Sequence, residues 1–190
     1  MIQKRKTEMS DQKRIAICGI KHAGKSTVGK IVAETLGIPF ADSDELLQQK
    51  YDPALSVREI YLKLGEEGFR QLEAKTIRDF SAEKTAFVLA LGGGALSNPF
   101  LTEDDLRTLG VICCIDVPDD VAYERILRKG LPPFLAKETD PRAAFAQSNA
   151  ARRKVFREKS DVLIKVSGED AATVHPRHTA NRLINAINLE

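Results

Sequence analysis

The 190-residue sequence contains only three cysteines, and their spacing argues against a cysteine-based metal site or a disulfide framework. Cys18, Cys113 and Cys114 lie in apolar runs, as is typical of buried thiols in a protein from a reducing compartment. Long apolar runs are missing as well, since no stretch approaches the ~20 residues that cross a bilayer. The first residues also lack the apolar core of a secretory signal. We therefore expect a cytoplasmic protein without a membrane partner.

A charge excess of either sign is also missing, since the formal net charge is +2. Basic residues are scattered among acidic ones, so no basic face is predicted and nucleic acid is not an expected partner. No internal repeat, low-complexity tract or apolar interface stripe stands out, so we expect a monomer. Residues 1–13 are polar and are interpreted as a disordered tail. Residues 14–190 have the length of one domain with its own core.

The sequence of residues 19–26, GIKHAGKS, matches the phosphate-binding loop of nucleoside-triphosphate enzymes. Its glycines let backbone N–H groups approach phosphate oxygens, and a following helix adds its positive N-terminal end. Lys25 would reach the β and γ phosphates, and the Ser26 hydroxyl would bind Mg²⁺. Such a loop needs a strand before it and a helix after it, and residues 14–18 and 26–36 have those patterns. The alternative is a glycine-rich turn with a solvated lysine.

Short apolar segments typical of strands alternate with helical patterns along the domain. The strand-like segments are residues 14–18, 38–41, 86–91, 111–116 and 161–166. This alternation predicts a parallel sheet with helices on both faces. Ligands of such sheets bind beyond the carboxyl ends of the strands, which makes residues 19–26, 42–44 and 92–94 the candidate site segments. The turn-rich residues 130–140 are either a mobile cover over the site or a plain surface loop.

Two acidic patterns have both a structural and a chemical interpretation. Asp42 and Asp44 open a helix, where they could cap its first turn, or they could order Mg²⁺ and orient an attacking hydroxyl. Arg70 and Glu73 lie three residues apart on a helix. They are either a surface ion pair or a guanidinium group, steadied by Glu73, that binds a substrate carboxylate.

Two further patterns also have both a structural and a ligand-binding interpretation. Residues 92–94 are three glycines directly after an apolar strand, which is costly for local structure. Close approach of a ligand to the backbone explains them, and the alternative is a tight turn into a helix near residues 97–99. Arg152 and Arg153 lie on another helix, where most arginines are solvated; one that faces the site would supply a second cation.

In their order along the chain, these motifs resemble the shikimate kinase family. The matching segments are the phosphate loop at 19–27, FADSD at 40–44 for the family's F-x-D-x-D, GE at 65–66 with FRQLE at 69–73 for G-E-x-x-F-R-x-x-E, and GGGA at 92–95. The resemblance implies a three-layer α/β/α sandwich with a five-stranded parallel sheet, the P-loop fold of nucleoside-monophosphate kinases, and a lid at 130–140. It also implies an ATP-dependent phosphotransferase that converts shikimate to 3-phosphoshikimate in the chorismate pathway of aromatic amino acid biosynthesis.

The resemblance also implies roles for individual residues. Lys25 and Asp44 are the implied catalytic residues, with Asp44 holding substrate hydroxyls, while Ser26 and Asp42 serve the cofactor Mg²⁺, Asp42 through water. The implied ATP-binding residues are Gly19, His22, Ala23, Gly24, Lys25, Ser26, Thr27 and Arg125, the last along the adenine ring. The implied shikimate-binding residues are Asp44, Arg70, Gly92, Gly93, Gly94 and Arg152. Arg152 is matched through its spacing from Phe156, which stands in place of Tyr in the family's R-x-x-x-Y.

The sequence departs from the family at the lid, where the family has R-P-L-L and an arginine that reaches the transferring phosphoryl group. Residues 132–135 read PPFL instead. Arg128 or Lys129, just before the lid, could replace that cation, although a lysine does not reproduce a two-point contact. Two alternatives to a shikimate kinase therefore stay open. One is a kinase for another hydroxy acid such as gluconate, and the other is a module that binds ATP without transferring phosphate.

Overall fold

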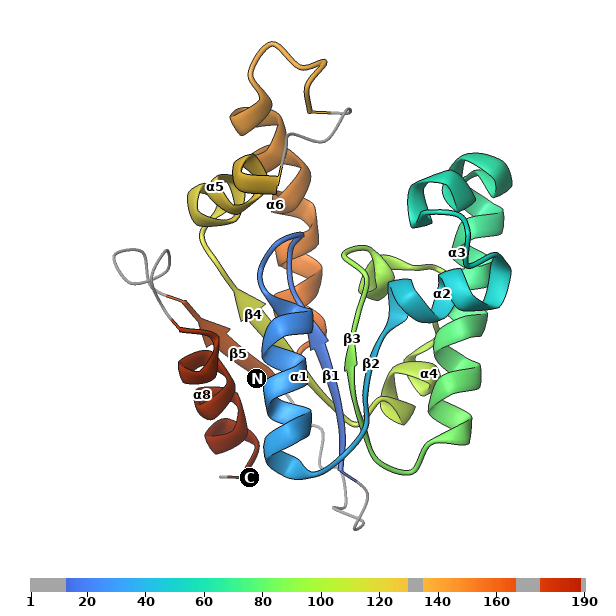
Figure 1. Cartoon of the computed structure of the whole chain (residues 1–190), viewed down its shortest axis with the longest axis vertical. Coiled ribbons are helices and arrows are strands. Elements are labelled where there is room, and N and C mark those ends of the chain that lie inside the picture. Colours follow the sequence, from blue (N-terminus) through green and yellow to red (C-terminus); the bar gives the residue numbers. More distant parts are fainter. Residues whose placement is uncertain (1–12, 130–134, 167–174, 189–190) are drawn as a thin grey trace.

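Five parallel strands form the centre of the protein, as the alternating sequence pattern predicts. The computed structural model describes residues 13–129, 135–166 and 175–188. Within them the strand order is β2-β3-β1-β4-β5 (Figure 1). The strands are β1 (Arg14–Cys18), β2 (Phe40–Asp42), β3 (Phe87–Ala90), β4 (Val111–Asp116) and β5 (Val162–Lys165). Each neighbouring pair is parallel, so all the carboxyl ends lie at one edge of the sheet.

The second strand is displaced from its expected position. The sequence pattern predicts residues 38–41, whereas β2 pairs Phe40 with Val88 and ends where Asp42 pairs with Ala90. The displacement gives Asp42 two structural positions at once. It is the last residue of the strand and also the N-cap of the following helix.

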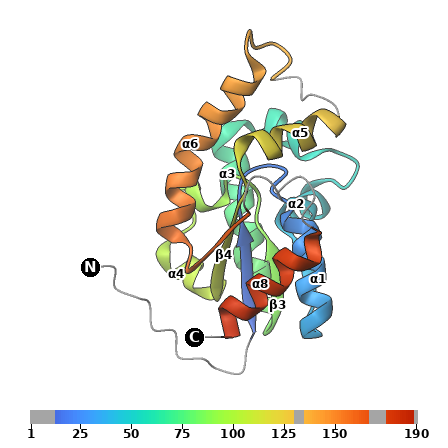
Figure 2. The ribbon, with the colours of Figure 1, turned by 90° about the vertical axis from the view of Figure 1, so that its left-hand side faces the viewer.

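Helices cover both faces of the sheet and complete the predicted α/β/α sandwich. They are α1 (Lys25–Leu36), α2 (Ser43–Tyr51), α3 (Val57–Glu83), the 3₁₀ turn η1 (Ala95–Ser97), α4 (Glu103–Thr108), α5 (Asp119–Lys129), α6 (Pro141–Lys159) and α8 (Pro176–Asn188). In the side view, α1 and α8 lie on one face of the sheet, and α4 and α6 lie on the other (Figure 2). Helix α3 bends at Gly65, whose φ of 69° and ψ of 179° are not helical.

Burial on both faces explains the apolar composition of the central strands. All four residues of β3 are buried, as are the last four residues of β1, and such strands have continuous apolar runs. Strand β5 alternates instead, with Val162 and Ile164 buried, Leu163 38% exposed and Lys165 exposed. It is therefore an edge strand with one open face.

The three cysteines are buried, as their apolar surroundings predict. Cys18 and Cys114 occupy paired positions on β1 and β4. A hydrogen bond with Cys114 and burial raise the pKa of the Cys18 thiol well above its usual range. Among the described residues, no helix is long and apolar enough to span a membrane.

Two glycines with left-handed backbone conformations end helices in different surroundings. Gly37 has a φ of 65°, and its N–H donates to the carbonyls of Ala33 and Glu34 at the end of α1. A Cβ atom there would have open space around it. Gly110 has a φ of 72°, between α4 and β4, and a Cβ atom there would overlap the carbonyl oxygen of Arg14.

These surroundings predict unequal costs for the same substitution. Gly37→Ala is expected to lower the free energy of unfolding by about 1 kcal/mol, the cost of a left-handed non-glycine residue. Gly110→Ala carries the same conformational cost and a steric overlap with β1, so its loss should be larger by about 1–3 kcal/mol. Urea unfolding followed by circular dichroism measures both variants, and equal losses would contradict the steric explanation.

Candidate active site

The predicted phosphate loop lies between β1 and α1, at the carboxyl edge of the sheet (Figure 1). Gly19, His22 and Gly24 have positive φ values of 151°, 62° and 95°, which wrap the chain tightly. A Cβ atom at Gly19 would lie 2.7 Å from the carbonyl oxygen of Ile115 on β4, so only glycine fits between the loop and its neighbouring strand. The loop leads into the N-terminal end of α1, where backbone N–H groups favour an anion.

Lys25 is the half-buried charge of this loop. Its Nζ donates hydrogen bonds to the carbonyl oxygens of Gly19 and Ile20, at 3.1 and 3.2 Å. Burial lowers the pKa of Lys25, and the carboxylates of Asp44 and Asp42 oppose that effect. The ammonium group is therefore positioned by its own loop and balanced by the acidic residues that follow β2.

A cavity of about 470 Å³ adjoins the loop. Six of the eight predicted ATP-binding positions, residues 22–27, line it together with a seventh, Arg125. Arg125 reaches across from α5 and donates a hydrogen bond from Nη1 to the carbonyl oxygen of His22, at 3.1 Å. The remaining position, Gly19, lies beneath the cavity at the contact with β4.

Several residues that line this cavity are missed by motif reasoning. They are Val28, Val166, Pro176 and Thr179, whereas Arg128, which also lines the cavity, is one of the two candidates for the lid cation. Val166 directly follows β5, so the rule that ligands bind beyond strand carboxyl ends would have found it. Pro176 and Thr179 come from α8, which the sequence gives no reason to connect with a phosphate loop about 150 residues earlier.

The Ser26 hydroxyl meets the first acidic residue after β2. Ser26 Oγ donates to Asp42 Oδ2 at 2.6 Å, while Asp42 Oδ1 accepts from the backbone N–H of Asp44 at 3.0 Å. Asp42 is thus the helix cap of α2, as the structural interpretation predicts, and its side chain also contacts the phosphate loop. A hydroxyl and a carboxylate are hard oxygen ligands of the kind that Mg²⁺ takes alongside phosphates and waters. No cluster of three or more His, Cys, Asp or Glu side chains suited to a metal occurs in the described residues.

Asp44 is a half-buried carboxyl group beside this pair. Burial and the negative charge of Asp42 raise its pKa to about 6, while Lys25 acts in the opposite direction. A Cβ atom at Gly92 would lie 2.7 Å from Asp44 Oδ1, so the carboxyl group packs directly onto the backbone of the triple glycine. Motif reasoning also misses Ser43. Its Oγ accepts a hydrogen bond from the Gly92 N–H at 2.8 Å and so fixes this part of the backbone.

The side chains of Arg152 and Arg70 lie against the other two glycines, Gly93 and Gly94. Arg70 Nη1 lies 3.1 Å from Glu73 Oε2 and 3.3 Å from the carbonyl oxygen of Gly94. A Cβ atom at Gly94 would lie 2.5 Å from Arg70 Nη1, and one at Gly93 would lie 3.8 Å from Arg152 Nη1. Burial and the charge of Arg70 both lower the pKa of Arg152. Two guanidinium groups therefore converge over residues 93–94.

This geometry bears on the earlier interpretations of those residues. The Arg70–Glu73 pair is not a surface pair, because Glu73 is only 4% exposed. Residues 92–94 turn directly into η1, as the turn explanation predicts, and their backbone is approached closely by charged side chains of the protein itself. Arg153 faces away toward the end of β4, where it pairs with Asp116 and with Asp119.

Part of the predicted lid lies outside the described residues. That part is residues 130–134, which include Pro132, Pro133 and Phe134. Residues 1–12 of the predicted tail also lie outside the described residues. Leu135 is buried in the core, and residues 136–140 form an exposed turn before α6. Arg128 lines the cavity, whereas the side chain of Lys129 is not described.

A phosphate loop, an acidic pair and two converging arginines at one edge of a parallel sheet define a P-loop kinase for a small anionic substrate. Comparison with known proteins agrees. The family model for shikimate kinase matches residues 21–188. A shikimate kinase from Tolumonas auensis is 32% identical over 157 residues, which cover 83% of this chain and 89% of that protein.

Solved structures agree with this assignment. A shikimate kinase from Acinetobacter baumannii, in complex with shikimate, superposes with a TM-score of 0.76 at 26% identity, covering 92% of this chain and 93% of the other. One from Bacteroides thetaiotaomicron gives a TM-score of 0.76 at 22% identity, covering 93% and 99%. The chain belongs to the shikimate kinase family. The predicted fold class and enzyme class, an ATP-dependent phosphotransferase acting on an alcohol group, are thereby confirmed.

The raised pKa of Asp44 predicts a conflict between stability and activity. The folded protein disfavours the ionised carboxylate, so this residue destabilises the fold above pH 6 and ceases to do so below about pH 4. Asp44→Asn should therefore increase the free energy of unfolding at pH 8 by up to about 3 kcal/mol, with a smaller gain at pH 4.5. The same variant should lose phosphotransferase activity.

Chemical unfolding of the ligand-free protein at both pH values measures this effect. Asp104→Asn is the matched control, because Asp104 lies on α4, away from the site, and among the described residues its ion pair is with Arg107 of the same helix. A loss of stability in Asp44→Asn at pH 8 would contradict the predicted direction.

Proposed function

We propose that the protein transfers the γ-phosphoryl group of ATP to a hydroxyl group of shikimate, giving 3-phosphoshikimate and ADP. The observation that carries this proposal is the convergence of Arg70 and Arg152 over Gly93 and Gly94, beside Asp44. Two guanidinium groups suit a carboxylate, and a neighbouring carboxylate suits the hydroxyl groups of the same small molecule. Family membership and the shikimate complex of the Acinetobacter relative support the same substrate.

The phosphate loop would bind the nucleotide through its backbone N–H groups and Lys25. Lys25 would exchange its bonds to loop carbonyls for bonds to the β and γ phosphates. Ser26 and Asp42 would hold Mg²⁺, which when bound neutralises charge on the phosphates. Arg125 would lie against the base, with Val166, Pro176 and Thr179 closing that end of the cavity.

Asp44 would orient the attacking side of the substrate. Its pKa of about 6 leaves it ionised near pH 7.5, so it accepts hydrogen bonds from ring hydroxyls. Arg70 and Arg152 would fix the carboxylate at the opposite side of the ring. Catalysis in such an enzyme comes mostly from positioning and from stabilising charge on the transferring group. The proposal also includes a monomeric, cytoplasmic enzyme.

The substrate is tested by ADP release with and without shikimate. We expect turnover that depends on shikimate, and Arg70→Ala or Arg152→Ala should raise the KM for shikimate roughly 30–300-fold, the loss of one charge-assisted carboxylate contact. The KM for ATP should change less than about 3-fold, because neither arginine lines the nucleotide cavity. Arg107→Ala, on α4, is the control that removes an arginine outside the site.

Each alternative has its own outcome in this assay. Turnover with gluconate but not with millimolar shikimate would identify a kinase for a different hydroxy acid. Binding of ATP by calorimetry without phosphoryl transfer to any acceptor would identify a binding module. Either result would overturn the proposed substrate.

Arg128 is the cation that we assign to the terminal phosphates, in place of an arginine within the lid. It lies three residues after Arg125 on α5 and lines the same cavity. Burial lowers the pKa of Arg125, and the charge of Arg128 lowers it further. Within the described residues Arg128 forms no hydrogen bond or ion pair. Like charges gathered at one cavity are balanced when an anion binds between them.

Arg128→Ala should lower kcat about 100-fold or more, as loss of a transition-state arginine does in phosphoryl transfer, without lowering the free energy of unfolding. Arg128→Lys should recover only part of the rate, because lysine lacks the two-point contact. Steady-state kinetics with Lys129→Ala as the neighbouring comparison separates the two candidates. A rate loss in Lys129→Ala alone would move the assignment to Lys129.

A further inference from the structure

Asn98 forms a fully satisfied buried amide directly behind the triple glycine. It is 3% exposed. Its Nδ2 donates to the carbonyl oxygen of Arg70 at 2.8 Å and to Glu73 Oε2 at 2.9 Å. Its Oδ1 accepts from the backbone N–H of Phe100 at 2.9 Å. Because the Phe100 N–H can only donate, it identifies the oxygen end of the amide, and the NH₂ group must face α3.

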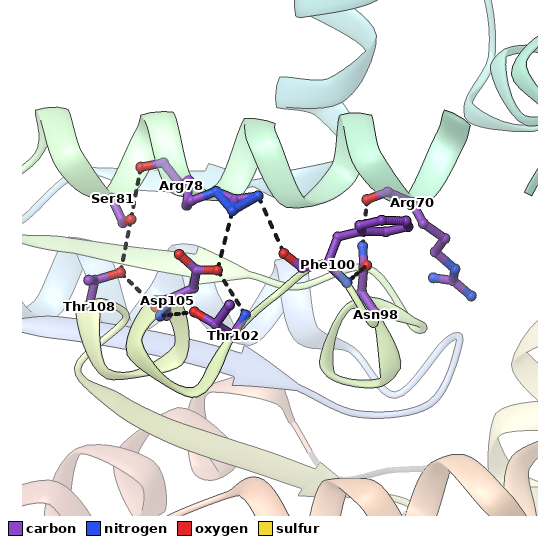
Figure 3. A network of polar contacts seen from close by, with 8 residues as sticks. All are labelled: Arg70, Arg78, Ser81, Asn98, Phe100, Thr102, Asp105 and Thr108. Carbon is purple, nitrogen blue, oxygen red and sulfur yellow. Dashed lines mark hydrogen bonds and ion pairs between the residues drawn. The ribbon is translucent and has the colours of Figure 1, made fainter. Parts of the chain in front are cut away.

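The loop that carries Asn98 is held to α3 at a second place. Arg78 Nη2 donates to the carbonyl oxygen of Phe100 at 3.3 Å, and Arg78 Nη1 lies 3.4 Å from Asp105 Oδ2. Asp105 and Thr102 form the capping box of α4. Figure 3 shows these contacts running along α3 from Ser81 to Arg70, with Asn98 at the end nearest the Arg70 side chain. The amide therefore has a fixed position relative to α3.

Asn98 acts on a carboxylate that influences two site residues. Glu73 Oε2 accepts from both Arg70 Nη1 and Asn98 Nδ2. Its other oxygen lies 3.2 Å from where a Cβ atom of Gly92 would be. The Glu73 charge also contributes to the raised pKa of Asp44. Movement of this carboxylate would therefore change the position of Arg70 and the electrostatic surroundings of Asp44.

The chemistry of the amide suits this place. A buried carboxylate needs donors for its lone pairs. A second cation there would compete with Arg70 for Glu73, whereas a neutral amide holds Glu73 and leaves the charge of Arg70 for a ligand. Asn98 also fixes the backbone carbonyl of Arg70 itself, so the arginine is held at its main chain and at its guanidinium group.

We propose that Asn98 is a positioning residue that sets, through Glu73, the direction of the Arg70 guanidinium group toward the substrate carboxylate. The proposal rests on the proposed role of Arg70 in carboxylate binding. It assigns specificity for the acid to a neutral side chain that does not itself touch the substrate. A purely structural role, in which Asn98 only ties the loop to α3, predicts a loss of stability without a selective effect on the substrate.

The direct test is the isosteric exchange Asn98→Asp, with Asn98→Ala beside it. The aspartate keeps the oxygen that accepts from Phe100 and replaces the NH₂ group by an oxygen facing Glu73 Oε2. At pH 8 we expect the KM for shikimate to rise about 10–50-fold, the loss of a hydrogen bond to a charged group. The KM for ATP should stay unchanged and kcat should change less than about 3-fold.

The effect of Asn98→Asp should depend on pH. The introduced carboxyl would face Glu73 and Arg70 on α3, with Asp44 on α2 and Arg152 on α6 next beyond them. Two adjacent carboxyl groups share a proton more readily as the pH falls, and that proton restores a donor toward Glu73. Relative to the wild-type protein at the same pH, the excess KM should therefore shrink between pH 8 and pH 6. Asn98→Ala should show no such recovery.

Thr102→Ala provides the matched structural control. It breaks the capping box in the same network, costs about 1 kcal/mol of stability, and leaves every contact of Glu73 in place. An equal rise in the KM for shikimate in Thr102→Ala would overturn the positioning role, as would Asn98 variants that lose stability with an unchanged KM.

A double-mutant cycle separates this proposal from the proposed function. If Asn98 acts through Arg70, the KM penalty of Asn98→Ala should vanish in an Arg70→Ala background. A penalty that adds in full would overturn the proposal even when Arg70 itself binds the acid. If Arg70→Ala alone leaves the KM for shikimate unchanged, the role of Arg70 in the proposed function fails, and the positioning role of Asn98 fails with it.

Discussion

The electrostatic attraction between Lys25 and the carboxylates that follow β2 is the interaction on which the rest of the site depends. Burial disfavours the charged form of both partners, since it lowers the pKa of Lys25 and raises that of Asp44. Each charge limits the shift of the other. Strands β1 and β2 end at the same edge of the sheet. The phosphate loop after β1 and Asp42 at the end of β2 therefore lie side by side.

The triple glycine extends the same arrangement to the other half of the site. Glycines are usually explained by a turn, and residues 92–94 do turn into η1. Their larger effect is to expose backbone on which charged side chains can lie, with Asp44 against Gly92 and Arg70 against Gly94. Because these three residues have no side chains, one carboxylate and two guanidinium groups fit within one small region. Asp44 and the two arginines thus lie against different glycines of the same turn.

The fold class and the phosphate loop could be predicted from the sequence, because the patterns that specify them are local. The loop at residues 19–26 specifies its own conformation, and the alternation of strands and helices specifies the fold class. The register of β2 could not be predicted, since the pairing of Phe40 with Val88 decides it. Asn98, Ser43 and the α8 residues of the cavity were missed for a related reason. Each is an ordinary residue whose role comes only from what the fold brings beside it.

The two edges of the sheet share a feature with a consequence beyond the site. Strand β2 has three residues and β5 has four, and the exposed side chains of β5 include Lys165. Short strands and an edge lysine present few unpaired backbone groups to another molecule. A chain of this kind gives little template for edge-to-edge pairing, even though its central strands are among the most apolar segments of the sequence. Resistance to aggregation is thus built into the lengths of the outermost strands.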